Sequence, residues 1–354
     1  MPILDIWLTV NTHCGLVEKF TRVVVYLSSL HLVFICTISV VISVILSPLK
    51  LTLVFRLSGS SLHLSYTTYD PASEIKIGAP LVITHGLMGN KGNWNSLCKV
   101  LSKKGRQYFM KFLSLTPVII IVIDARNHGE SPHTEEMNYH VMSKDILDLL
   151  DELAIEKAIL LGHSMGGKTS MLTALKHPER VESLIVVDVS PSTSPRAKNY
   201  PSLLQNMLNI QQKLTYDHPE LPLPSAKKLA EEMLKDVEQD LDVRQFLVTN
   251  LLKTNTTFRW KVNLDSIINN FRTVCEFPSI PDVCYNGPTL FIGGSESKYI
   301  VYADLPEIKR LFPSSQVHHI EGAGHWVHAD KPSVFLDTVQ TFLNEHEKSN
   351  NKNV

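Results

Sequence analysis

Short runs of apolar residues recur along much of the chain, and each run is too short to form a helix. They occupy residues 81–84, 118–123, 158–161, 184–187, 289–292 and 317–320. Uniformly apolar runs of this length are typical of strands in a parallel sheet that is covered on both faces. Longer stretches of helical character separate them. The alternation predicts an α/β fold with a mostly parallel central sheet flanked by helices.

The pattern changes ahead of the first run and after the last one. Polar and apolar residues alternate over residues 62–69, which predicts a strand at the edge of the sheet. A Gly/Ser patch at residues 58–61 indicates a linker, so we place the start of the folded domain at residue 58. The polar residues 346–354 predict a flexible tail.

A long stretch between two of the apolar runs contains no convincing strand. Within it, apolar residues recur at spacings of three and four, which is the pattern of amphipathic helices. The repeats span residues 203–214, 226–234 and 243–252. We therefore predict a helical cap over residues 192–287, inserted between two parts of the α/β core at 58–191 and 288–345.

The N-terminal part of the chain is different again. Residues 23–46 contain no Asp, Glu, Lys or Arg and are rich in Val, Ile and Leu. An apolar stretch of this length can span a bilayer. We interpret residues 1–57 as an apolar anchor or targeting segment followed by a linker, with membrane association through residues 23–46 as one outcome and removal of a presequence as the other.

Composition excludes several classes of function. The net charge of −1, from 34 Lys and Arg against 35 Asp and Glu, gives no overall field that would attract nucleic acid. The five cysteines are thinly spread and form no C-x-x-C pair, so neither a disulfide framework nor a zinc site is expected. We therefore expect no nucleic-acid partner and no metal site.

The clearest chemical signal is Gly162-His163-Ser164-Met165-Gly166, which lies between a predicted strand and a predicted helix. A sharp strand-to-helix turn lifts the serine hydroxyl above the sheet, and the flanking glycines allow the close backbone packing that the turn requires. The N-terminus of the following helix favours developing negative charge. We predict that Ser164 is a nucleophile, and the alternative is a purely structural turn.

A second glycine-containing loop, His85-Gly86-Leu87-Met88-Gly89, follows the strand at residues 81–84. In a serine hydrolase with a strand-turn-helix nucleophile, the corresponding loop supplies one oxyanion N–H and the residue after the nucleophile supplies the other. We predict Leu87 and Met165 as these two donors. His85 is expected to orient the loop.

The general base should follow the last strand. His325, in a loop that begins with Gly322, fits this position and the chain order that the fold requires. The acid that orients the base stays open among three residues. Asp188 ends the strand after the nucleophile, Asp265 lies at the end of the cap, and Glu296 follows the strand at 289–292.

Several motifs together resemble the α/β-hydrolase domain-containing protein 11 family and its bacterial esterase relatives, over residues 81–343. These are the two glycine motifs above, Asp124-Ala125-Arg126-Asn127-His128-Gly129, Asp188, Val262-Asn263-Leu264-Asp265 and Gly324-His325-Trp326-Val327-His328. The resemblance implies a mitochondrial serine hydrolase that acts on esters such as diacylglycerols without a cofactor. It also implies roles for Ser164, His325 and Asp265, whereas the bacterial relatives use the position of Asp188 with a serine matching Ser297.

These observations predict a carboxylic ester hydrolase whose substrate is a small acyl ester or lipid of the diacylglycerol type. Hydrolysis would pass through an acyl-enzyme on Ser164. An acyltransferase that uses the same intermediate is one alternative, and a non-catalytic binding protein that keeps the fold is another. For localisation, the resemblance favours the mitochondrion, and the apolar N-terminal segment offers membrane anchoring as the alternative.

Overall fold

The computed structural model describes the chain in several stretches. The backbone is described for residues 3–8, 21–26, 39–46, 49–56, 62–70, 78–109, 119–194 and 200–350, and the side chains for 62–70, 78–102, 119–194 and 200–345. Two units, Met1–Ser61 and Leu62–Val354, are distinguished by their internal contacts. Each is described by itself.

The described part of the first unit consists of strands. β1 (Ile3–Leu8) pairs with β2 (Thr21–Tyr26), and β3 (Ser39–Leu46) pairs with β4 (Leu49–Arg56), both in antiparallel fashion. The predicted apolar segment at 23–46 is therefore extended wherever it is described, and its residues 27–38 lie outside the described residues. Among the described residues, no helix has the length and apolar character needed to cross a membrane.

The second unit is built around a seven-stranded sheet with the order β13-β12-β9-β8-β6-β7-β5. All neighbouring strands are parallel except β5, which pairs antiparallel with β7 at the edge. The strands are β5 (Tyr66–Tyr69), β6 (Leu81–Thr84), β7 (Ile120–Ile123), β8 (Ala158–His163), β9 (Val181–Val187), β12 (Thr289–Gly294) and β13 (Ser315–Ile320). The predicted α/β fold with a mostly parallel sheet is confirmed. We call the edge where the parallel strands have their carboxyl ends the rim.

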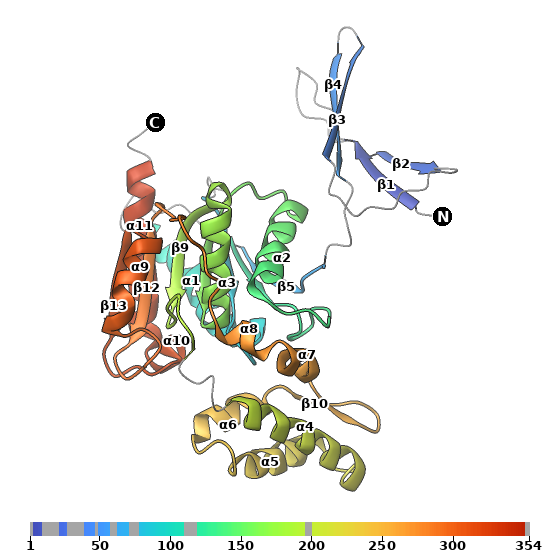
Figure 1. Ribbon diagram of the computed structural model, residues 1–354, viewed down its shortest axis with the longest axis vertical. Coiled ribbons are helices and arrows are strands. Elements are labelled where there is room, and N and C mark those ends of the chain that lie inside the picture. The colour runs from blue at the N-terminus through green and yellow to red at the C-terminus, as the bar shows by residue number, and fades with distance from the viewer. Residues whose placement is uncertain are drawn as a thin grey trace. The chain divides into compact units, whose positions relative to one another are not determined.

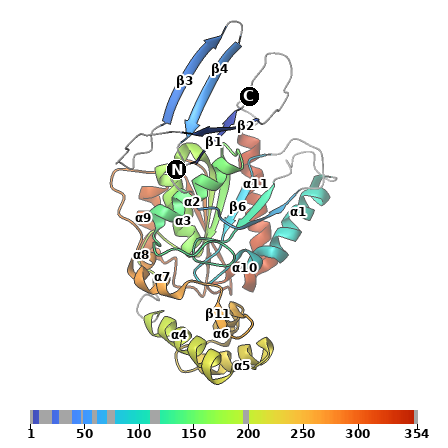
Figure 2. The ribbon, with the colours of Figure 1, turned by 90° about the vertical axis from the view of Figure 1, so that its right-hand side faces the viewer.

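Helices cover both faces of this sheet, as Figure 2 shows. α1 (Asn95–Phe109) and α11 (Pro332–Asn350) share one apolar core with the sheet, whereas α2 (Tyr139–Glu152), α3 (Met165–Lys176) and α9 (Leu305–Leu311) share the other. Alternate residues of a strand point to opposite faces, so apolar residues at every position are needed to bury both. α11 continues to Asn350, so the helix includes the first residues of the predicted flexible tail.

The helical insertion between β9 and β12 forms the cap. Its elements are α4 (Tyr200–Asp217), α5 (Leu223–Leu234), α6 (Leu241–Val248), β10 (Leu251–Lys253), β11 (Phe258–Trp260), α7 (Leu264–Asn269) and α8 (Phe271–Cys275). In Figure 1, α4, α5, α6 and β10 lie at the lower end of the view, and α7 and α8 lie above them, closer to the sheet. The prediction of a cap without strands was wrong, because β10 and β11 form an antiparallel hairpin. Three-residue strands are too short to show a recognisable alternation. The helix predicted to reach residue 252 ends at Val248.

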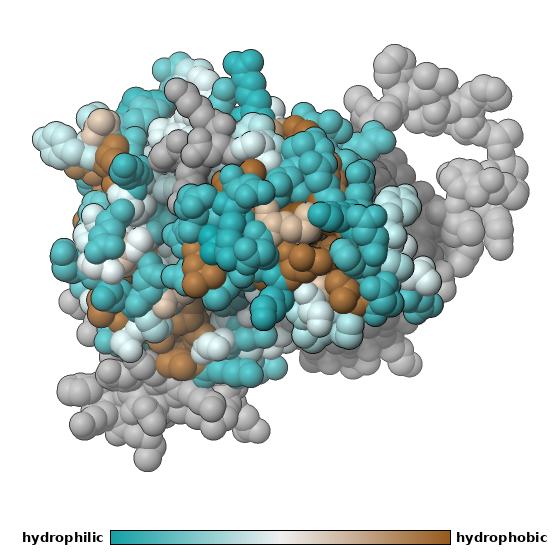
Figure 3. Space-filling model, turned by 90° about the horizontal axis from the view of Figure 1, so that it is seen from below, coloured by the Kyte–Doolittle hydropathy of each residue, from teal (hydrophilic) through white to brown (hydrophobic). Residues whose placement is uncertain are grey.

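Apolar side chains of the cap turn inward. Those of α4, α5, α6 and the hairpin form one buried cluster with rim residues such as Met88 and Met165. The face seen from below in Figure 3 is mostly hydrophilic over the described residues, with smaller hydrophobic groups between. The cap is thus packed against the rim of the sheet. The remaining short helices are η1 (Lys91–Trp94), η2 (Pro178–Arg180), η3 (Tyr302–Asp304) and α10 (Val327–Asp330).

Candidate active site

Ser164 lies on the sharp turn that the sequence motif predicts. β8 ends at His163, α3 begins at Met165, and Ser164 between them has φ 52° and ψ −114°. A positive φ is unfavourable for a residue with a Cβ and is retained only where the surroundings enforce it. Gly166 shows how tight those surroundings are, because a Cβ there would lie 2.4 Å from the carbonyl oxygen of Thr84. The turn holds a partly exposed hydroxyl at the rim.

The structure brings His325 and Asp188 together. His325 Nδ1 lies 2.7 Å from Asp188 Oδ2. Because an ionised carboxylate can only accept, Nδ1 carries the proton and Nε2 is left as the acceptor that a general base needs. Asp188 is fully buried, and its oxygens also accept hydrogen bonds from Gly294 N, at 3.0 Å, and from the Ser297 hydroxyl. Three donors therefore fix the carboxylate in place.

The other two candidates for the acid lie elsewhere. Asp265 is exposed in the first turn of α7 in the cap. Glu296 is exposed after β12, where only its backbone N–H bonds to the loop that carries His325. Of the three carboxylates weighed from the sequence, Asp188 is the one in contact with the imidazole. The position that the family resemblance favours, Asp265, makes no such contact in this structure.

Two residues that the sequence did not point to hold the His325 loop. His163, next to the nucleophile, has Nε2 3.0 Å from the carbonyl oxygen of His325. A carbonyl only accepts, so His163 donates this bond. Burial lowers the pKa of His163 well below its usual value, and nearby His325 and His328 lower it further, which keeps its ring neutral. Tyr299 stacks on the His325 ring with centroids 3.8 Å apart.

The loop at residues 85–89 lies directly beside Ser164. A Cβ placed on Gly86 would be 3.2 Å from Ser164 Cβ. The loop is closed by a bond from Gly89 N to Gly86 O, at 2.9 Å, and His85 Nδ1 lies 2.8 Å from the same oxygen. His85 Nε2 accepts from Ala125 N at 3.1 Å, so this buried imidazole links the loop to the segment after β7. The predicted donors Leu87 and Met165 thus lie on segments that meet at Ser164.

His128 gives the Asp124–Gly129 motif a function that its sequence did not reveal. The backbone N–H of Met88 donates to His128 Nε2 at 3.2 Å, and His128 Nδ1 lies 3.0 Å from the carbonyl oxygen of Arg126. Burial lowers the pKa of His128 to about 3, so the imidazole stays neutral and can accept. Arg126 forms a buried ion pair with Asp145, 2.6 Å apart. This motif supports the loop next to the nucleophile.

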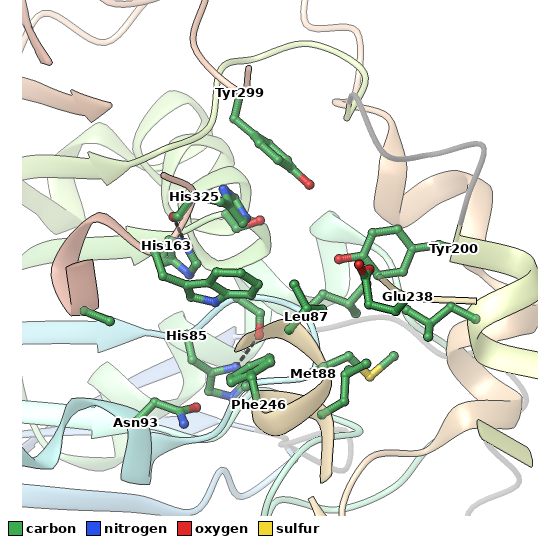
Figure 4. Close-up of a pocket in the computed structure, with 18 of the residues that line it drawn as sticks. His85, Leu87, Met88, Asn93, His163, Tyr200, Glu238, Phe246, Tyr299 and His325 are labelled. Atoms are coloured by element: carbon green, nitrogen blue, oxygen red, sulfur yellow. Dashed lines mark hydrogen bonds between the residues drawn. The ribbon is translucent and has the colours of Figure 1, made fainter. Parts of the chain in front are cut away.

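A pocket of about 390 Å³ opens between the rim and the cap, with Ser164 and His325 in its wall. Figure 4 shows His325 and His163 on one side, with Leu87, Met88 and Phe246 close by and Tyr200 and Glu238 farther along. Apolar cap residues complete the wall, namely Leu203, Val237, Val243 and Leu247. Among the described residues, the lining contains one carboxylate, that of Glu238, and neither Lys nor Arg. Uncharged, largely apolar ligands suit such a wall.

No group of three or more His, Cys, Asp or Glu side chains that could hold a metal ion occurs among the described residues. What the pocket does offer is a serine on a strained turn, an imidazole with a buried carboxylate behind it, and a backbone loop next to the serine. This constellation can carry out acyl transfer through a covalent intermediate.

Comparison with known proteins agrees with this class. The model of the α/β-hydrolase fold family matches residues 79–332, and the chain belongs to that family. Within it, the chain is 42% identical to the zebrafish (Danio rerio) protein named sn-1-specific diacylglycerol lipase ABHD11, over 81% of this chain and 84% of that protein. It is therefore a member of the ABHD11 group, as its motifs predict.

Two other relatives are informative. A solved structure of a marine microorganism esterase shares 31% identity with a TM-score of 0.67, covering 80% of this chain and all of that one. A yeast (Saccharomyces cerevisiae) protein named probable alcohol acetyltransferase is 31% identical over 76% of this chain and 78% of its own length. Taken with the lipase and esterase relatives, the fold and family identify the chain as a carboxylic ester hydrolase.

Proposed function

We propose that the protein hydrolyses neutral lipid esters of the diacylglycerol type through an acyl-enzyme on Ser164. The observation that carries the proposal is the bond between His325 Nδ1 and the buried carboxylate of Asp188, at 2.7 Å, on the wall of an apolar pocket that also contains Ser164. That bond holds the imidazole in the tautomer that can accept a proton from a hydroxyl.

The proposed reaction has two halves. Ser164 Oγ attacks the ester carbonyl while His325 Nε2 takes its proton, and the N–H groups of Leu87 and Met165 stabilise the oxyanion. The imidazolium then donates the proton to the departing alcohol. In the second half, His325 takes a proton from water as the water attacks the acyl-enzyme, and collapse of that intermediate releases the acid and restores Ser164. Asp188 stabilises the imidazolium in both halves.

Two features of the pocket support a neutral lipid as the substrate. Most of the cap residues in its wall are apolar, and none of its described lining residues is a Lys or Arg that would attract a phosphate or carboxylate head group. The zebrafish relative is named for an activity on diacylglycerol, which is a neutral ester.

The test is hydrolysis by the full-length chain of a diacylglycerol, the phosphatidic acid with the same acyl chains, and a p-nitrophenyl ester. We expect turnover of the diacylglycerol and the p-nitrophenyl ester, much weaker turnover of the phosphatidic acid, and loss of all activity in Ser164→Ala. Activity that survives in folded Ser164→Ala would refute the mechanism. Preference for phosphatidic acid would refute the substrate class.

Acyl transfer to an alcohol is a second candidate, supported by the yeast relative named as a probable alcohol acetyltransferase. The same acyl-enzyme would be resolved by an alcohol in place of water. Adding ethanol to the ester assay distinguishes the two, because a transferase would release the ethyl ester in excess of the free acid. A hydrolase would release mainly the acid.

Placement in the mitochondrion is a further proposal, supported by the family resemblance alone. A fusion of residues 1–61 to a fluorescent protein tests whether this unit directs a passenger to mitochondria. Carbonate extraction of the same fusion tests membrane association, because a peripheral protein is released by this treatment and an integral one is retained.

A further inference from the structure

The backbone of Met88 is held from two sides, one in the core and one in the cap. Its N–H donates to His128 Nε2 at 3.2 Å, and its carbonyl oxygen accepts from Asn250 Nδ2 at 2.6 Å. Met88 has a φ of 64°, which a side-chain-bearing residue adopts only when its surroundings enforce it. Because Met88 follows Leu87 directly, these two bonds restrain the backbone immediately after the N–H proposed to bind the oxyanion.

Asn250 lies in the cap, in the turn between α6 and β10, and is completely buried. Its amide orientation is fixed, because the Met88 carbonyl can only accept and must therefore face the NH2 group. The other amide atom, Oδ1, is buried and has no hydrogen-bond partner among the described residues. A buried acceptor without a partner is costly, so this side chain is not explained by stability alone.

A second set of bonds joins the cap to the same support. Asn263, which precedes α7, donates its backbone N–H to the carbonyl oxygen of Asn127 at 2.9 Å, and Asn127 Nδ2 donates to Ser266 Oγ at 3.0 Å. Asn127 immediately precedes His128. The cap therefore contacts the oxyanion loop, residues 85–89, directly through Asn250. Through Asn263 and Ser266 it also contacts the segment that carries His128, the other residue bonded to the Met88 backbone.

We propose that Asn250 is a positioning residue that couples seating of the cap to assembly of the oxyanion hole. This inference rests on the proposed hydrolysis at Ser164. With the cap seated, the Asn250 amide holds Met88 so that the Leu87 N–H points at the developing oxyanion. When the bond is lost, the backbone of Met88 keeps only its bond to His128, and the Leu87 N–H moves away from its best position.

The test compares Asn250→Leu and Asn250→Asp with Asn270→Leu in the full-length chain. Asn250→Asp keeps the size of the side chain but replaces the NH2 donor with an oxygen. It therefore tests the bond to Met88 without the change in packing that leucine introduces. Asn270 is the control, because its Nδ2 donates from the cap to the carbonyl oxygens of Glu135, at 2.8 Å, and Ser266, at 2.9 Å, and to none on the oxyanion loop. Each variant is first checked for folding by thermal denaturation.

Two measurements separate positioning from a structural role. The first is kcat and KM for a p-nitrophenyl ester. The second is the inhibition constant of an alkyl trifluoromethyl ketone, which adds to the serine and forms an oxyanion, compared with that of the matching methyl ketone, which binds without adding. The ratio of the two constants reports on oxyanion stabilisation alone.

We expect both Asn250 variants to lower kcat about 10- to 100-fold, since a donor moved by a fraction of an ångström loses part of what a deleted donor would lose. Binding of the trifluoromethyl ketone should weaken by a similar factor. KM and the inhibition constant of the methyl ketone should change less than about threefold, which corresponds to under 0.7 kcal/mol. Asn270→Leu should leave the inhibitor ratio unchanged.

A folded Asn250→Asp with wild-type kcat and inhibitor ratio would overturn the proposal, as would equal losses of the ratio in Asn270→Leu. Absence of ester turnover in the wild-type chain would instead overturn the proposed function.

Discussion

The rim of the sheet and the cap are held in place in different ways. At the rim, Ser164, Asp188 and His325 each follow the end of a strand by a few residues, and the first two sit at positive φ. Their positions are set by short backbone turns. The cap is instead joined to the core by packing and by single hydrogen bonds such as that of Asn250. The comparison indicates that backbone turns position the candidate catalytic groups, whereas side-chain packing and hydrogen bonds position the cap wall of the pocket.

Substitutions of Asp188 and Asp265 should differ most in their effects, because Asp188 lies on the rim and Asp265 in the cap. Asp188→Asn should lower kcat about 10⁴-fold, because the amide would favour the wrong tautomer of His325. Asp265→Asn should change kcat less than about fivefold, since Asp265 is exposed and not in contact with the imidazole. Steady-state ester hydrolysis by both variants is the measurement. The reverse order of losses would assign the acid to the cap.

Lys168 bonds to backbone carbonyls on both sides of the chain's passage between the core and the cap, and its removal should lower the stability of the fold. This buried α3 side chain donates to the carbonyl oxygens of Ser192, at 2.6 Å, and Cys275, at 2.7 Å, which lie on the two connections between core and cap. Lys168→Met leaves both carbonyls without this donor and should lower the free energy of unfolding by about 2–4 kcal/mol. Urea denaturation measures it, and KM for the ester should rise as the cap loosens.

Lys176→Met is the control for this prediction. Lys176 lies exposed at the end of the same helix, so its loss should change the free energy of unfolding by less than about 0.5 kcal/mol. If the two lysine variants unfold at the same urea concentration as the wild type, the two connections do not depend on Lys168.

A pH dependence of stability is also expected to originate at the rim. Burial lowers the pKa of His128 and of His328 to about 3, whereas in the unfolded chain each should titrate near 6.5. Below about pH 6.5 the unfolded chain takes up protons that the folded chain excludes, so stability present above that pH is lost progressively toward pH 3. Each histidine adds up to about 1.4 kcal/mol per pH unit to the slope.

Urea denaturation at several pH values between 4 and 7 measures this slope. His128→Gln and His328→Gln should each make the loss of stability with falling pH less steep, whatever they do to stability at pH 7. Slopes identical to that of the wild type in both variants would show that these imidazoles are protonated in the folded protein.

Local sequence predicted the sheet, the serine and the base, because each is defined by residues close together in the chain. The apolar runs gave the strands, and glycine motifs marked Ser164 and His325. The acid could not be chosen, because its contact with His325 spans 137 positions and depends on β9 and β12 being neighbours in the sheet. No motif shows that order.

The supporting residues were missed for the same physical reason. Asn250 and Met88 are 162 positions apart, as are His163 and the carbonyl of His325. Such bonds follow from tertiary packing and leave no local pattern. Tyr299 carries no signal beyond being aromatic and close to β12. The β10–β11 hairpin was overlooked because each strand has only three residues.

The most direct test of the central claim is covalent labelling of the full-length chain with a fluorophosphonate, followed by peptide mass mapping. We expect one adduct, on Ser164, that is absent in Ser164→Ala and forms far more slowly in Asp188→Asn. An adduct on another residue, or undiminished labelling of folded Ser164→Ala, would contradict it.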